Sequence, residues 1–193
     1  RATSHARGLS AGANRLALQR TKADLAFTLS VSEGLLSMTQ SNDPVVIVAF
    51  ARTPMGGFQG ALSGVKATDL GATAVKAAVE RAGVSADKVE QIFMGCVLPA
   101  GLGQAPARQA AIGAGLGEHV EATTVNKMCG SGLQAAMMAH DALMAGTADI
   151  IVAGGMESMT GAPYVMNKHR GGARIGQRFA FLDQAHYSMV KTN

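Results

Sequence analysis

One cysteine in this chain has neighbours that suit a reactive thiol. Cys129 lies in residues 126–132, which read Asn-Lys-Met-Cys-Gly-Ser-Gly. The apolar residues 122–125 before it predict a strand, and the Ala- and Met-rich residues 133–145 after it predict a helix. Cys129 is therefore expected at a tight turn between a strand and the start of a helix.

Such a turn favours nucleophilic chemistry. Gly130 and Gly132 allow positive φ angles and let the backbone approach a ligand closely. The free N–H groups and the positive dipole end of the helix favour the thiolate, which is the nucleophilic form of cysteine. We expect Cys129 to attack a carbonyl carbon and to carry the acyl group as a thioester. Its own backbone N–H is the candidate donor to the oxyanion.

The other cysteine and the histidines give no such signal. Cys96 lies in the apolar run 92–98 and is expected to be a small buried hydrophobic residue. Two cysteines far apart in the sequence do not form a disulfide framework, and a reducing compartment fits them better. No histidine has metal-ligand spacing to a cysteine, an aspartate or a second histidine, so we expect no metal site and assign no role to any of them: His5, His119, His140, His169 and His186.

Composition excludes two classes of partner. The 193 residues suit one domain, or one domain and part of another. No apolar run is long enough to span a membrane. Aromatic residues make up 4% with no Trp, and residues 41–193 carry a net charge of only +1 of the total +4. Both features argue against nucleic-acid binding.

The first residues differ from the rest. Residues 1–37 are rich in Arg and Ser, and no acidic residue occurs before Asp24, which is typical of a mitochondrial transit peptide. The alternative is an upstream translated stretch or an expression artefact that precedes Met38. Residues 1–40 are therefore treated as an extension. The expected location is cytoplasmic, or the mitochondrial matrix if residues 1–37 are a genuine transit peptide.

The folded part alternates strands with helices. Strands are expected at 45–50, 89–95, 122–125 and 149–155, and the first of them has the β-branched pattern of a strand buried on both faces. Helices are expected from about Thr68 to Gly83, with Thr68 or a nearby polar residue as the cap, and over 105–114. This alternation predicts an α/β fold with a parallel sheet and its chemistry at the carboxyl ends of the strands. Glu157, at that end, is expected to accept backbone N–H groups as a structural cap.

Five stretches together resemble the thiolase family. They are residues 48–54, 94–101, 103–111, 126–132 and 153–159, and they occur in the family's order. The resemblance is closest to the biosynthetic acetyl-CoA acetyltransferases. It implies a five-layer α/β/α/β/α fold made of two similar halves with an inserted loop domain. This chain corresponds to the N-terminal half-fold, with a βαβαβαβ core in residues 41–155 and the start of the loop domain in residues 156–193.

The resemblance also implies an activity. Cys129 matches the acyl-carrying cysteine, and the reaction is the condensation of two acetyl-CoA molecules to acetoacetyl-CoA, or the reverse thiolysis. No cofactor is implied beyond the coenzyme A thioesters that serve as substrates, and residues that bind coenzyme A are not assigned. The family's enzymes are homodimers or homotetramers. The basic run Lys168, Arg170, Arg174 and Arg178 is read as a solvated surface loop, with contact to coenzyme A phosphates or a neighbouring subunit as the alternative.

The departures from the family pattern bear on activity. The family also uses a histidine in a Gly-His-Pro motif, an asparagine and a second cysteine in a Cys-x-Gly motif, and these motifs do not occur in this sequence. Residues 177–193 no longer follow the family pattern. We therefore expect that this chain by itself does not run the full cycle. Two alternatives stay open: a fragment of a related cysteine-based condensing enzyme, or a half-domain that is not catalytic.

Overall fold

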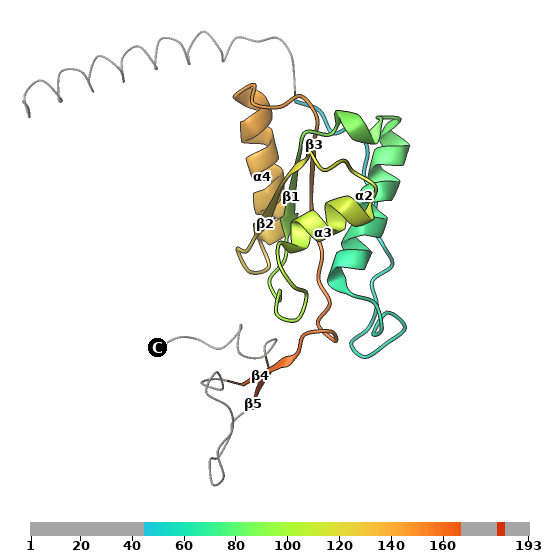
Figure 1. Cartoon of the computed structure of the whole chain (residues 1–193), viewed down its shortest axis with the longest axis vertical. Coiled ribbons are helices and arrows are strands. Elements are labelled where there is room, and N and C mark those ends of the chain that lie inside the picture. The colour runs from blue at the N-terminus through green and yellow to red at the C-terminus, as the bar shows by residue number, and fades with distance from the viewer. Residues whose placement is uncertain (1–44, 167–180, 184–193) are drawn as a thin grey trace, which may run out of the picture. The chain divides into compact units, whose positions relative to one another are not determined.

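The structure, a computed structural model, describes residues 45–166 and 181–183 (Figure 1). The extension 1–40 and the basic run from Lys168 to Arg178 lie outside the described residues. The expectations for these two segments therefore remain predictions.

A parallel sheet forms the centre of the fold. Strand β1 (Gln91–Gly95) lies between β2 (Glu121–Val125) and β3 (Ile151–Gly155), and both neighbours run parallel to it. The register pairs Gly95 with Val125 on one side and with Gly155 on the other. All three strands therefore end at the same edge of the sheet, where the following loops can meet.

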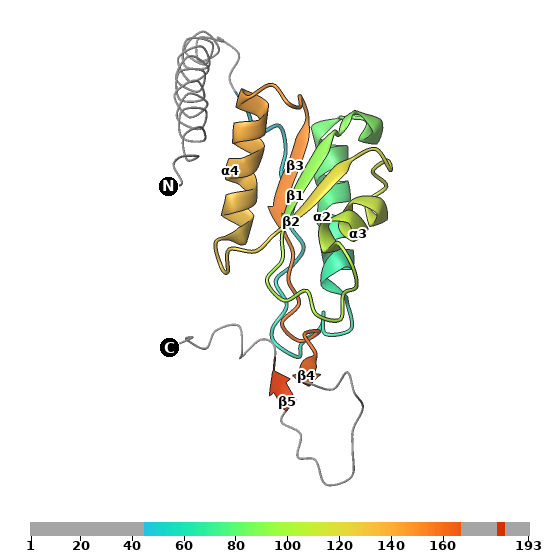
Figure 2. The same ribbon diagram turned by 60° about the vertical axis from the view of Figure 1, so that its left-hand side comes forward.

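Helices cover both faces of the sheet. Helices α2 (Ala67–Ala82) and α3 (Pro106–Gly113) pack on one face, and α4 (Ser131–Met144) packs on the other (Figures 1 and 2). A short 3₁₀ helix, η1 (Ala86–Lys88), leads into β1. This arrangement confirms the predicted layered α/β class.

The core lies between β1 and the pair α2 and α3. Ile92 and Met94 of β1 are almost completely buried. They belong to one apolar cluster with Val75 of α2 and with Ala107 and Ala110 of α3. The small alanine side chains let α3 pack close to the sheet.

The helix boundaries follow the sequence signals closely. Helix α2 ends at Gly83, whose φ of 65° is the left-handed conformation expected of a C-terminal glycine. Its N-cap is Lys66, without a side-chain capping bond, whereas Thr68 is buried inside the first turn. Of the two expected possibilities, Thr68 is therefore wrong, and a nearby polar residue, Lys66, takes the N-cap position. Pro106 opens α3, a position where its missing N–H costs nothing.

The expected strand at 45–50 is wrong. These residues form neither strand nor helix, and the side chains of Ile47 and Phe50 are 88% and 83% exposed. A strand needs a neighbour for its backbone N–H and C=O groups, and residues 45–50 pair with none of the described strands. The carbonyl of Phe50 instead accepts a hydrogen bond from Arg81 Nη1 at 2.9 Å. The described core is thus αβαβαβ, from α2 to β3, with three strands in place of the four expected.

A second, small sheet was not predicted. Strands β4 (Tyr164–Met166) and β5 (Phe181–Asp183) pair antiparallel. Three-residue strands are too short for a periodic pattern to stand out in the sequence. Within the described ranges, no helix has the length and apolar character that crossing a bilayer requires.

Candidate active site

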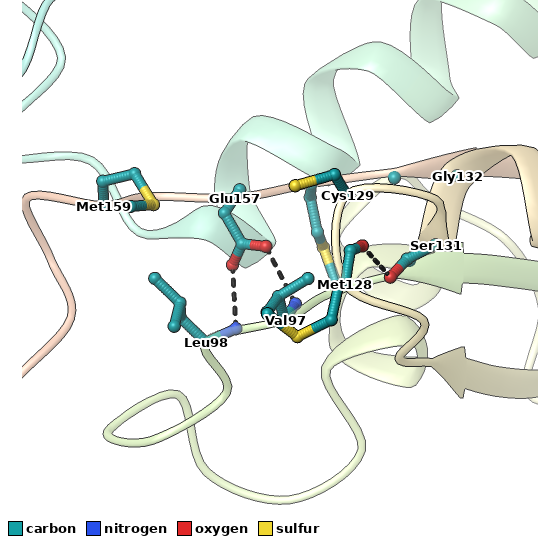
Figure 3. Close-up of a pocket in the computed structure, with 11 residues that line it drawn as sticks. Val97, Leu98, Met128, Cys129, Ser131, Gly132, Glu157 and Met159 are labelled. Atoms are coloured by element: carbon teal, nitrogen blue, oxygen red, sulfur yellow. Dashed lines mark hydrogen bonds between the residues drawn. The ribbon is translucent and has the colours of Figure 1, made fainter. Parts of the chain in front are cut away.

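The residues that follow the three strands surround one cavity. Its volume is about 430 Å³, within the usual range for small-molecule sites. The lining comes from the ends of β1 and β3, from the loops after the three strands and from the first turn of α4. It includes Val97, Leu98, Cys129, Glu157 and Met159 (Figure 3). Convergence at this edge agrees with the expectation from the strand order.

Cys129 lies at this cavity. It is solvent-exposed and precedes Gly130, the N-cap residue of α4. Most backbone N–H groups of the turn are used within the turn itself. Those of Lys127, Met128, Gly130 and Ser131 donate to oxygens of residues 126–131. The N–H of Cys129 is not among these donors, which keeps it available as the candidate oxyanion donor.

A buried hydroxyl closes the turn. Ser131 is 5% exposed, and its Oγ donates to the carbonyl of Met128 at 2.6 Å. The same Oγ accepts from the backbone N–H of Lys127 at 2.8 Å. A buried hydroxyl that both donates and accepts holds the backbone on either side of Cys129 in one geometry.

The positive φ angle in the turn belongs to a methionine and not to a glycine. Met128 has a φ of 50°, in the left-handed region, whereas Gly130 has a φ of −88°. Gly132 lies inside the first turn of α4. The expectation that the two glycines take positive φ was therefore wrong. A left-handed residue with a side chain costs about 1–3 kcal/mol and persists only where its surroundings enforce it.

Gly95 is the glycine that the close approach requires. A Cβ built on Gly95 would lie 2.8 Å from the backbone carbon of Ser131 and 2.9 Å from the nitrogen of Gly132. The end of β1 therefore packs closely against the first two residues of α4, which follow Cys129 by two and three positions. Gly95 was not among the site residues expected from the sequence, although its place at a strand end next to the apolar run was a usable signal.

Replacing Gly95 by alanine should displace the nucleophile turn. The added methyl meets backbone rather than a flexible side chain, so we expect a loss of about 1–3 kcal/mol in the free energy of unfolding and slower alkylation of Cys129. Gly154→Ala is the matched control, because a Cβ there meets nothing closer than Met94 Sδ at 3.5 Å. Denaturant melts and thiol labelling measure both effects. Equal unfolding free energies and equal alkylation rates in the two variants would contradict the close contact.

Glu157 binds the loop that follows β1. Its Oε2 accepts from the N–H of Val97 at 2.8 Å, and its Oε1 accepts from the N–H of Leu98 at 3.1 Å (Figure 3). The thiol of Cys96 lies 3.7 Å from Oε1. Glu157 thus accepts backbone N–H groups, as expected from the sequence.

Cys96 is chemically unlike Cys129. It is 1% exposed, in agreement with the buried hydrophobic role predicted for it. Burial, and next the charge of Glu157, raise the pKa of the Cys96 thiol to about 11. At neutral pH Cys96 is therefore a protonated thiol, which is a poor nucleophile.

The raised pKa of Cys96 predicts a pH dependence of stability. Its pKa is about 11 in the folded chain against an ordinary value of 9.0, so the folded state holds this proton more tightly. This contribution to stability is complete below about pH 9 and is lost as the pH rises through 11. Wild type should lose more stability between these values than Cys96→Ala, measured by urea melts at each pH. Parallel pH profiles of the two proteins would contradict the shift.

No metal site accompanies these groups. The residues described in the structure contain no cluster of three or more His, Cys, Asp or Glu side chains that could hold an ion. His119 and His140, the two described histidines, are both exposed and are not part of the cavity lining.

The fold and the site together define a class. The structure places an exposed cysteine, in a strained turn at the start of a helix, at the edge of a parallel sheet that lies between helices. The family model described as "Thiolase, N-terminal domain" matches residues 45–189. The chain belongs to the thiolase family.

Similar proteins carry acetyl-CoA acetyltransferase names. The mitochondrial acetyl-CoA acetyltransferase B of Xenopus laevis is 56% identical over 124 residues, covering 64% of this chain and 30% of the relative. The acetyl-CoA acetyltransferase of Cupriavidus necator is 56% identical over 132 residues, covering 68% and 34%. A cytosolic acetyl-CoA acetyltransferase of Gibberella zeae is 52% identical over 135 residues, covering 70% and 34%. The chain thus spans about a third of the length of these relatives.

Proposed function

We propose that this chain carries the acyl-accepting part of an acetyl-CoA acetyltransferase, with Cys129 as the nucleophile. The observation that carries the proposal is the exposed thiol of Cys129 at the start of α4, opening on the cavity at the strand ends. The 52–56% identity to acetyl-CoA acetyltransferases supports acetyl-CoA as the acyl donor.

The acylation step follows from this geometry. The thiol of Cys129 gives its proton to water, and the thiolate sulfur attacks the thioester carbon of acetyl-CoA. The carbonyl electron pair moves onto oxygen, where the N–H of Cys129 donates to it. The tetrahedral intermediate then collapses, the bond from carbon to the coenzyme A sulfur breaks, and coenzyme A leaves as a thiolate that takes a proton from water. The product is an acetyl thioester on Cys129. The apolar side chains of Leu98, Met128 and Met159 offer the methyl group a suitable surface.

The complete reaction would join this acetyl group to a second acetyl-CoA. That step yields acetoacetyl-CoA, and its reverse is thiolysis. It requires a base for the α carbon of the second substrate, and in the family that base belongs to motifs absent from this sequence. The proposal therefore assigns acylation to this chain, with coenzyme A thioesters as the only substrates and no further cofactor.

Assembly and location extend the proposal. Leu133 and Met137 lie one turn apart on α4 and are 70% and 50% exposed. These exposed apolar side chains suit an interface that another subunit covers in a homodimer or homotetramer. The relatives include mitochondrial and cytosolic proteins. We propose a cytoplasmic location, or the mitochondrial matrix if residues 1–37 act as a transit peptide.

Incubation with acetyl-CoA tests the proposal. We expect one acetyl group to be incorporated, which peptide mapping places on Cys129 and which hydroxylamine removes because it is a thioester. Labelling of lysines alone, or no labelling, would contradict the assignment. In that case the half-domain without catalysis becomes the better reading.

A further inference from the structure

We propose that Glu157 is a positioning residue that holds Cys129 in place through Val97 and Asn126. This inference rests on the proposed role of Cys129 and goes beyond a local cap. Its basis is an unbroken series of hydrogen bonds from the carboxylate to the nucleophile turn. We call this series the strand-end relay: Glu157, Val97, Asn126 and Met128.

The first link joins the loop after β3 to the loop after β1. Both oxygens of Glu157 accept backbone N–H groups, from Val97 at 2.8 Å and from Leu98 at 3.1 Å (Figure 3). Hydrogen bonds to an ionised acceptor are stronger than neutral ones. The carboxylate therefore fixes the two peptide groups on either side of Val97, a residue of the cavity lining.

The second link joins the Val97–Leu98 peptide group, which carries both the Leu98 N–H and the Val97 carbonyl, to the nucleophile turn. The carbonyl of Val97 accepts from Asn126 Nδ2 in a long hydrogen bond of 3.4 Å. Asn126 Oδ1 accepts from the N–H of Met128 at 3.2 Å. The side-chain amide of Asn126 thus bridges the β1 loop to the residue that directly precedes Cys129.

The relay acts on the strained point of the turn. Met128 has a φ of 50°, a conformation that its surroundings must enforce. The three segments of the relay follow three different strands, so their relative positions are not fixed by chain connectivity. If the carboxylate is lost, Val97 and Asn126 lose a fixed partner, Met128 can relax to a common φ, and Cys129 turns with it.

Glu157→Gln is the sharpest variant. It keeps the size of the side chain but places an NH₂ donor against one of the two N–H groups, which then has no acceptor. We expect the rate of Cys129 alkylation by iodoacetamide to fall about three- to tenfold. Glu118→Gln removes the same charge from an exposed side chain and should leave the rate unchanged.

A double-mutant cycle separates positioning from general destabilisation. Asn126→Ala should slow alkylation as Glu157→Gln does, and the double variant should be no slower than the slower single variant, because both changes break one relay. Val75→Ala, in the buried core of α2, should lower the melting temperature without changing the rate.

Three results would overturn the relay. Glu157→Gln could leave the rate within about twofold of wild type, the two single effects could multiply, or Val75→Ala could slow alkylation as much as Glu157→Gln. Each result would show that Glu157 acts only on local stability and does not position Cys129, which would still be reactive. If Cys129 of the wild type reacts no faster than Cys96, the proposed function itself fails and the relay with it.

Discussion

Cys129→Ala should abolish incorporation of acetyl groups from acetyl-CoA into the chain, whereas Cys96→Ala should retain it. The reason is the contrast between the two thiols. Cys129 is exposed at the cavity, and Cys96 is 1% exposed with a pKa raised to about 11. Only Cys129 can therefore reach a thioester and attack it. Intact-mass spectra of the three proteins after incubation with acetyl-CoA measure the effect.

Cys129→Ser provides a stricter comparison. A serine preserves the shape of the turn but lacks the nucleophilicity of a thiol without an adjacent base, so incorporation should fall to the level of Cys129→Ala. Circular dichroism should show the same helix content in all variants. Retention of acetyl groups by Cys129→Ala would assign acylation to another group and refute the mechanism.

The second large effect concerns the condensation step. The purified chain should form no acetoacetyl-CoA even when Cys129 is fully acetylated. A general base contributes about 10²–10⁴ in rate, and Cys129 and Glu157 are the ionisable residues that line the described cavity. Both Glu157 oxygens already accept backbone N–H groups, which leaves that carboxylate poorly placed to remove a proton from a substrate.

Mass spectrometry of the coenzyme A products measures this second effect. Cys129→Ala purified in parallel controls for thiolase carried over from the expression host, since any product common to both preparations is contamination. Acetoacetyl-CoA that depends on Cys129 and persists through further purification would show that the chain supplies its own base.

The sequence predicted the parts of the site that depend on local patterns. The apolar run before Cys129 and the Ala-rich run after it indicated β2 and α4, because period and composition are local signals. The contrast between the two cysteines also followed from their neighbours, with Cys96 in an apolar run. The family resemblance, carried by five separate stretches, is confirmed by the match over residues 45–189.

The parts that the sequence did not predict depend on contacts between distant segments. Residues 45–50 have the composition of a buried strand, but a strand exists only with a partner, and composition does not supply one. The positive φ falls on Met128 because Ser131 and Asn126 hold the turn, although the neighbouring glycines are intrinsically better suited. The relay from Glu157 joins residues about 30 and 60 positions apart, and no local pattern encodes such a link.

The proposed mechanism requires Cys129 to be far more reactive than Cys96, and competition labelling measures this difference directly. The native chain is treated with limiting iodoacetamide at neutral pH, with and without acetyl-CoA, and both cysteine peptides are quantified over time. The mechanism predicts that Cys129 is alkylated first and is protected by acetyl-CoA, while Cys96 stays unmodified until the chain is unfolded. Equal rates for the two cysteines, or no protection of Cys129 by acetyl-CoA, would contradict it.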